Sequence, residues 1–194
     1  MVRQSHKWNK CVHKERKISM IAQTERLTIR KIILEDAEFI FELMNQPSWI
    51  RFIGDRGLRS LEATIDYLRD GILKTYANSD IGLFVIVRKS DGEPLGITSL
   101  IKRTDLPQID LGFALLERYA GRGYAYEASL VTLTYCHSHL KLDNVLAISQ
   151  PNNLRSAQLL QKLNFSKEKL VNLSHTNNEL QLWTYHQTKS IGTR

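Results

Sequence analysis

A short stretch of glycines and arginines has the residue types and spacing for chemistry. Arg118, Gly121, Arg122 and Gly123 follow a strongly β-forming segment, and a helical pattern begins at Tyr124. Glycines let the backbone turn tightly and present its N–H groups, and a helix N-terminus adds partial positive charge. The two arginines add full positive charge. We therefore expect an anion-binding site here, with phosphate groups as its ligands.

Two well-known phosphate-binding motifs do not match this stretch. A dinucleotide fingerprint would need a third glycine where Tyr126 stands, and a Walker loop would need a Gly-Lys-Ser/Thr sequence at this point. The spacing Arg-x-x-Gly-x-Gly, after a strand and before a helix, is a different pattern. It resembles the loop with which the GNAT N-acetyltransferases bind coenzyme A.

Further segments follow in the order that this family shows. The sequence ERLTIR at 25–30 resembles its opening strand, and DLGF at 110–113 resembles its fourth strand. The sequence NLRS at 153–156, followed by LLQKLNF at 159–165, resembles the Asn-x-x-Ser…Leu-Gly-Phe segment of the ribosomal-protein acetyltransferases of the RimJ/RimL type. The resemblance extends over residues 24–186, which is nearly the whole chain outside its N-terminal tail.

The resemblance implies acetyl-CoA as the co-substrate and no metal. A bulge in the fourth strand would aim backbone N–H groups at the thioester oxygen, and the glycine loop would hold the pyrophosphate. The pantetheine arm would enter between splayed fourth and fifth strands. The residues implied to bind acetyl-CoA are Phe113, Ala114, Leu115, Arg118, Gly121, Arg122, Gly123, Tyr124, Ala125 and Asn153.

The proton acceptor is expected to be a carboxylate, because acetyl transfer to an amine requires removal of the ammonium proton. By resemblance we assign this role to Asp110, which stands where many relatives have glutamate. The alternative is an edge-strand aspartate that only binds the substrate amine or solvent. Glu117 is the other nearby carboxylate, but it lies on the phosphate-loop side, where we expect a surface role.

The proton donor to the departing thiolate is less well defined. Many family members carry a tyrosine at the position of Leu160, so that acid is missing here. Ser156 follows the RimL-type pattern and is our second catalytic candidate, as a proton relay. Its alternative role is a hydroxyl in the first turn of a helix that bonds the backbone. A thiol pKa of about 8.5 means that departure near neutral pH needs no strong acid.

Hydrophobic periodicity places these residues in an α/β domain. The order of elements and the resemblance together predict a single-domain, GNAT-like, mixed and largely antiparallel central sheet flanked by helices, over residues 20–190. Residues 48–59 are expected to be irregular. Strands are expected at 25–30, 81–88, 94–101, 109–116, 144–149, 166–173 and 179–186, and helices at 37–45, 60–76, 124–140 and 153–163.

The net charge of +7 belongs mostly to the N-terminus, because residues 1–19 carry +5 and the remaining 175 residues carry +2. We expect 1–19 to be a basic, disordered tail, and we expect nucleic acid to be a partner only through it. No apolar run approaches the roughly 20 residues that span a bilayer, so we expect no membrane partner. Two cysteines and no secretory pattern indicate a cytoplasmic protein, and the histidine spacing does not suit a metal site.

The acceptor is expected to be a primary amine, either a protein N-terminus, possibly of a ribosomal protein, or a small molecule. Residues that could line its site are Trp49, Arg51, Phe52, Asp55, Arg56, Arg59, Tyr67 and Tyr76, although core packing is the favoured role of the aromatic ones. Monomer and homodimer are both open. The alternative function is a non-catalytic acyl-CoA-binding regulatory module.

Overall fold

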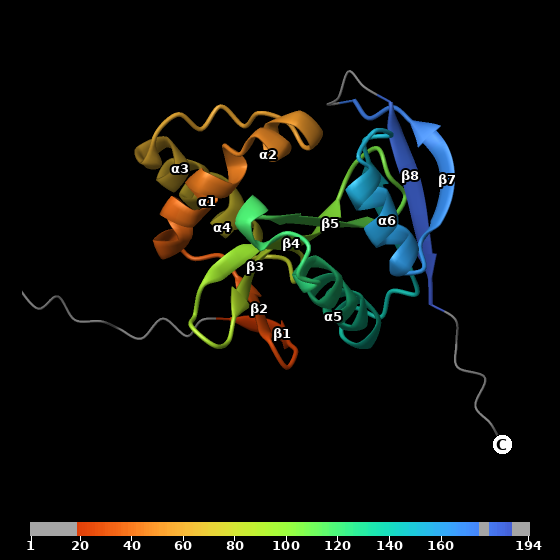
Figure 1. Cartoon of the computed structure of the whole chain (residues 1–194), viewed down its shortest axis with the longest axis horizontal. Helices are drawn as coiled ribbons and strands as arrows, with labels where there is room; N and C mark the ends of the chain where they lie inside the picture. The colour runs from red at the N-terminus through yellow and green to blue at the C-terminus, as the bar shows by residue number, and fades with distance from the viewer. Residues whose placement is uncertain (1–18, 175–178, 188–194) are drawn as a thin grey trace, which may run out of the picture.

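The computed structural model describes residues 19–174 and 179–187, and its strands form one eight-stranded sheet in the order β1-β2-β3-β4-β5-β6-β8-β7 (Figure 1). All neighbouring strands are antiparallel except β5 and β6. The strands are β1 (Met20–Gln23), β2 (Leu27–Lys31), β3 (Gly82–Arg88), β4 (Pro94–Lys102), β5 (Ile109–Leu115), β6 (Asn144–Ser149), β7 (Ser166–Val171) and β8 (Leu180–His186). The expected tail, 1–19, lies outside the described residues except for its last one.

Helices cover both faces of the sheet (Figure 1). Successive side chains of β3 point to opposite faces of the sheet. Phe84 and Ile86 pack with α5 and α6 on one face, whereas Val85 between them packs with α1 to α3 on the other. The helices are α1 (Ala37–Met44), α2 (Pro47–Phe52), α3 (Leu61–Tyr67), α4 (Leu73–Thr75), α5 (Tyr124–Ser138) and α6 (Leu154–Lys162), with short turns η1 (Leu34–Asp36), η2 (Leu68–Ile72) and η3 (Glu117–Tyr119). The expected α/β class with a largely antiparallel sheet is confirmed.

The N-terminal half differs from the sequence expectations in three places. Strand β1 was not expected, and it is only four residues long with two exposed ends. Helix α2 occupies part of the segment expected to be irregular, because Pro47 starts it at the first helical positions, where a missing N–H costs nothing. The helix expected over 60–76 is interrupted by the π-helical turn η2, which contains the poor helix former Gly71.

Strands β5 and β6 diverge after a single pairing, between Asp110 and Leu146. This confirms the expected splay between these two strands, which are the fourth and fifth of the family numbering. The bulge expected in β5 is not seen against β4, because the register runs without a shift from Gly96 opposite Leu115 to Lys102 opposite Ile109. The open edges of β5 and β6 therefore arise from their divergence and not from an interrupted ladder on the β4 side.

Candidate active site

The glycine loop leads into α5 through two left-handed residues. Gly121 has φ 75° and Gly123, the N-cap of α5, has φ 79°, a conformation that is costly for a residue with a Cβ. The first helical hydrogen bond runs from Glu127 N to Gly123 O at 3.0 Å. The N–H groups of the three residues between them therefore have no intrahelical acceptor and can donate to an anion.

Arg26 lies beside this helix start and was not expected there. Its Nε donates to Glu127 Oε2 at 2.7 Å, and its Cζ lies 4.7 Å from the centroid of the Tyr124 ring. Glu127 also accepts from Thr24, so the turn before β2 is tied to α5. Although burial acts in the opposite direction, the hydrogen bonds from Thr24 and Arg26 hold the pKa of Glu127 below its ordinary value. The turn before β2 thus helps to fix the loop.

The two arginines of the loop are placed differently. Arg122 is exposed, and its guanidinium has no ion-pair partner in the described parts of the chain. Arg118 is bonded to Glu42 of α1, with one contact of 3.1 Å, and lies 3.6 Å from Glu93. The bond to Glu42 is the main reason that the pKa of Arg118 is raised above its ordinary value. Arg122 is therefore left without an ion-pair partner among the described residues, whereas Arg118 is engaged by α1, and the phosphate-binding role of each stays a prediction.

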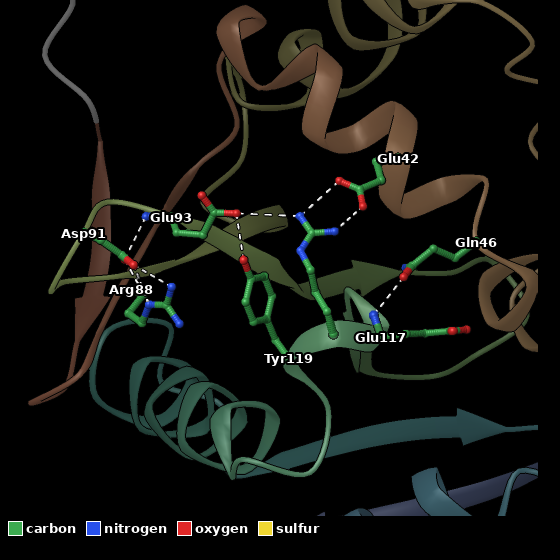
Figure 2. A network of polar contacts seen from close by, with 8 residues as sticks. Glu42, Gln46, Arg88, Asp91, Glu93, Glu117 and Tyr119 are labelled. Carbon is green, nitrogen blue, oxygen red and sulfur yellow. Dashed lines mark hydrogen bonds and ion pairs between the residues drawn. The ribbon is translucent and has the colours of Figure 1, made fainter.

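Glu93 contacts both Arg118 and Tyr119 of η3. Tyr119 donates its hydroxyl proton to Glu93 at 2.9 Å, and the same carboxylate faces Arg118 (Figure 2). Glu93 directly precedes β4, and the other residues come from α1 and η3, so three parts of the fold meet here. Arg118 is 46% exposed in its side chain, so its pairs contribute little to stability, and their main effect is to orient η3.

The end of β5 presents N–H groups toward the gap beside β6. Leu116 N donates to Leu95 O of β4 at 2.9 Å. Because N–H groups alternate in direction along an antiparallel strand, that of Ala114 also points to β4, while those of Phe113 and Leu115 point to the β6 side. Strand β6 has no pairing with β5 at this level. Of the three residues expected to polarise a thioester, Phe113 and Leu115 are thus suitably directed and Ala114 is not.

Gln46 clamps the same strand end from the α1 side. Its Oε1 accepts from Glu117 N at 2.8 Å (Figure 2). Its Nε2 donates to Leu115 O at 3.4 Å. Gln46 is the N-cap of α2 and follows the last residue of α1 by two positions. The sequence offered no indication of this contact, which joins the helix junction to the strand that approaches the glycine loop.

Asp110 lies at the single β5–β6 pairing, where the gap begins. It is 1% exposed, and Arg103 Nε donates to its carboxylate at 2.8 Å. Burial raises the pKa of Asp110 above its ordinary value, and Arg103 offsets part of that rise. The structure thus places Asp110 where β5 and β6 begin to diverge and gives it a guanidinium partner that the sequence did not reveal. Glu117, the alternative carboxylate, is exposed on the loop side.

The start of α6 faces the other side of the gap. Asn153 caps this helix, because its Oδ1 accepts from Ser156 N at 3.2 Å. The Nδ2 of Asn153 is not used by that cap, so it stays available to a ligand. Ser156 is partly buried, whereas Leu160, where many relatives have tyrosine, is 1% exposed in the core. The residue at 160 is therefore part of the packing in this protein.

The aromatic residues expected near an acceptor are divided between core and surface. Trp49 is 4% exposed in the core, and burial raises the pKa of Tyr76 to about 12 as its hydroxyl bonds the backbone of Leu83. Phe52 lies under Arg51, whose Cζ is 4.9 Å from the ring centroid. Of the polar candidates, Arg59 pairs with Asp55, and Arg56 is exposed. The segment after α1 therefore presents arginines rather than aromatic rings to a ligand.

Neither metal-binding clusters nor membrane spans are found in the part of the chain that the structure describes. Within residues 19–174 and 179–187, no three side chains of histidine, cysteine, aspartate or glutamate are grouped to hold an ion. The helices of these residues are all too short or too polar to cross a bilayer.

Comparison with known proteins gives consistent results. Residues 26–166 match the family model described as an acetyltransferase (GNAT) domain. An uncharacterized N-acetyltransferase p20 of Bacillus licheniformis is 29% identical over 153 residues, which cover 76% of this chain and 83% of that protein. The fold is similar to an acetyltransferase from Agrobacterium tumefaciens, with TM-score 0.73, 24% identity and coverage of 96% and 100%. It is also similar to RimL, a ribosomal L7/L12 α-N-protein acetyltransferase, with TM-score 0.74, 13% identity and coverage of 88% and 95%.

Proposed function

The chain belongs to the GNAT family of acetyl-CoA-dependent N-acetyltransferases, and we propose that it transfers the acetyl group directly to a primary amine in a ternary complex. The observation that carries this proposal is the divergence of β5 and β6 beside the glycine-capped start of α5. The free N–H groups at that start suit the pyrophosphate, and the gap gives a thioester access to the strand edges. Arg122 would add charge at the loop, and the Nδ2 of Asn153 would bind the pantetheine arm.

The proposed reaction begins when the substrate ammonium loses a proton to Asp110, directly or through water. The amine nitrogen then attacks the thioester carbonyl carbon, whose oxygen accepts from the N–H groups of Phe113 and Leu115. A C–N bond forms and the C–S bond breaks, which releases an amide and a thiolate. The remaining ammonium proton passes to the thiolate, with Ser156 as a relay, and Asp110 returns its own proton to water.

The acceptor is proposed to be either a protein N-terminus or a small amine. A protein N-terminus is supported by the similarity of the fold to a protein named as a ribosomal L7/L12 α-N-protein acetyltransferase. A small amine is supported by the exposed arginines of the segment after α1, which can pair with an acidic group beside the amine. Both acceptors require the same chemistry at the gap.

A non-catalytic acyl-CoA-binding module is the alternative function. Two observations favour it: Leu160 replaces an acid in the buried core, and Asp110 is already paired with Arg103. A module of this kind would bind acetyl-CoA at the loop without consuming it. Catalysis and binding must therefore be measured separately.

The test measures acetyl-CoA consumption against a panel of amines and peptide N-termini, alongside acetyl-CoA affinity by calorimetry. Turnover with at least one acceptor would support the proposed transfer. Acetyl-CoA binding with no consumption for any member of a broad panel would favour the module. Absence of acetyl-CoA binding would contradict both functions.

A further inference from the structure

A polar pocket of about 450 Å³ lies where the β5–β6 gap opens toward the α2 side. Its lining residues are Arg51, Gln150, Pro151, Asn152 and Glu179. Three of these directly follow β6, and they precede the N-cap of α6. A pocket of this volume suits a small molecule, because ligand pockets in proteins usually hold about 300–1,000 Å³.

Two chain contacts fix this pocket at the mouth of the gap. Gln46 attaches the junction of α1 and α2 to the end of β5, and Arg51 lies on α2, which starts at the next residue. On the other side, Ser149 of β6 pairs with Gln181 of β8, so the residues after Ser149 and the residues before Gln181 leave the sheet at the same end. Figure 1 shows α2 and the first turn of α6 facing the same region above β5. A ligand bound in this pocket could therefore extend toward the gap between β5 and β6.

The pocket brings together one positive and one negative side chain. Arg51 and Glu179 are both exposed, and neither has an ion-pair partner within the described residues. Arg59, in the segment that follows Arg51, differs in this respect, because it is bonded to Asp55. A planar guanidinium binds a carboxylate through two parallel hydrogen bonds, and a carboxylate attracts an ammonium. Gln150 and Asn152 add neutral donors and acceptors.

We infer that the acceptor is a small zwitterion of amino-acid size, whose carboxylate pairs with Arg51 and whose ammonium is drawn past Glu179 toward the gap. This inference rests on the proposed acetyl transfer and names the substrate class for the same site. It excludes simple amines as preferred acceptors, because they leave Arg51 unpaired. It also excludes peptide N-termini that carry no acidic group beside the amine.

The experiment measures kcat/KM for matched pairs of acceptors with the full-length protein and saturating acetyl-CoA. L-Leucine is compared with isoamylamine and leucinamide, L-phenylalanine with phenethylamine, and L-alanine with an alanine-initiated tripeptide amide. The free amino acid is expected to exceed its carboxylate-free partner by about tenfold or more, which is the range of a hydrogen-bonded charge pair. This preference is measured as a ratio and does not depend on the absolute rate.

Variants then assign the preference to the pocket. Arg51→Gln is expected to raise the KM of the amino acid and to bring the ratio close to one, with acetyl-CoA affinity unchanged. Arg69→Gln removes an exposed arginine that pairs with Asp66 and does not line the pocket, and it should preserve the ratio. Glu179→Gln should raise the KM of both partners of a pair, because both carry an ammonium.

Three outcomes would overturn the inference. Equal kcat/KM for an amino acid and its carboxylate-free partner would do so while leaving acetyl transfer intact, as would an Arg51→Gln ratio that matches the unmodified protein. Acetyl-CoA binding without turnover for any amine would instead reject the proposed function, and the inference would fall with it. Circular dichroism and acetyl-CoA affinity of each variant separate loss of folding from these results.

Discussion

Replacing Asp110 with asparagine removes one charge from a side chain that is 2% exposed and changes its shape very little. If Asp110 accepts the substrate proton, asparagine cannot replace it, because an amide is not a base at neutral pH. General bases contribute about 10²–10⁴-fold to a rate, so kcat should fall by at least about a hundredfold. Acetyl-CoA affinity should stay the same, since the carboxylate lies at the far end of β5 from the glycine loop.

The cost to folding should be small by comparison. Removing one partner of a fully buried ion pair costs about 3–5 kcal/mol when the remaining charge is stranded. Here the remaining partner, Arg103, is 31% exposed and can be hydrated. The asparagine also no longer has to hold a charge that burial disfavours. We expect the free energy of unfolding to fall by about 1 kcal/mol, which leaves the variant folded at 25 °C.

The pH dependence gives a second readout. Burial raises the pKa of Asp110 above its ordinary value of 3.8, and only the deprotonated form accepts a proton. In the unmodified protein, kcat/KM should therefore decline with falling pH at a midpoint above that value. Arg103→Gln removes the neighbour that lowers this pKa, so the midpoint should move to higher pH.

The assay is steady-state turnover of acetyl-CoA with the best acceptor, measured between pH 5 and pH 9, with calorimetry and urea unfolding in parallel. Glu117→Gln is the matched control, since it removes an exposed carboxylate on the loop side of the same strand. Asp110→Asn with normal turnover would refute the base assignment. A midpoint that Arg103→Gln does not move would refute the proposed link between this arginine and catalysis.

Three other changes test the loop, the clamp and the acid stability. Gly123→Asp places a carboxylate among the free N–H groups of α5, and calorimetry should show about a hundredfold weaker acetyl-CoA binding or worse. The control Gly57→Asp changes a glycine at a similar positive φ of 69°, and this variant should bind acetyl-CoA normally. Equal loss of acetyl-CoA affinity in Gly123→Asp and Gly57→Asp would contradict the loop assignment. Gln46→Leu removes both bonds of the clamp and should raise the acetyl-CoA KM several-fold in steady-state assays, with Gln46→Glu recovering only the bond from Glu117 N. The pKa of Glu127 is lowered in the folded state, so its stabilisation is present above its ordinary pKa of 4.5 and is lost as pH falls through the folded value. Glu127→Gln should narrow the difference between urea midpoints at pH 7 and pH 3, and an unchanged difference would contradict this reasoning.

The elements that the sequence predicted well are those with strong local patterns. The β-forming run of β3, its turn to β4 and the long helix α5 need no distant partner to be recognised. Helix α2 was missed because Pro47 is ambiguous locally: proline both ends one helix and begins the next. Strand β1 was missed because four residues with exposed ends have little pattern.

The glycine loop could be predicted from the sequence alone, and its resemblance to a family motif implied acetyl-CoA as the ligand. Backbone conformation at Gly121 and Gly123 is a local property, and a helix N-terminus follows from the residues that form it. The motif order therefore identified the family without any knowledge of contacts. The resemblance also named Asp110 as a base and Asn153 as a ligand of the pantetheine arm, and both roles stay predictions.

Which charges remain available to a ligand depends on long-range packing and could not be predicted from the sequence. Arg118 meets Glu42 from 76 positions away, and Arg26 meets Glu127 from 101 positions away. No local pattern predicts such pairs, since they depend on how helices pack against the sheet. Packing thus engages Arg118 and leaves Arg122 and Arg51 exposed, and it brings Arg51 and Glu179 into one pocket. Ion pairs between distant residues are a property of the folded chain, and they determine where the positive charge can act.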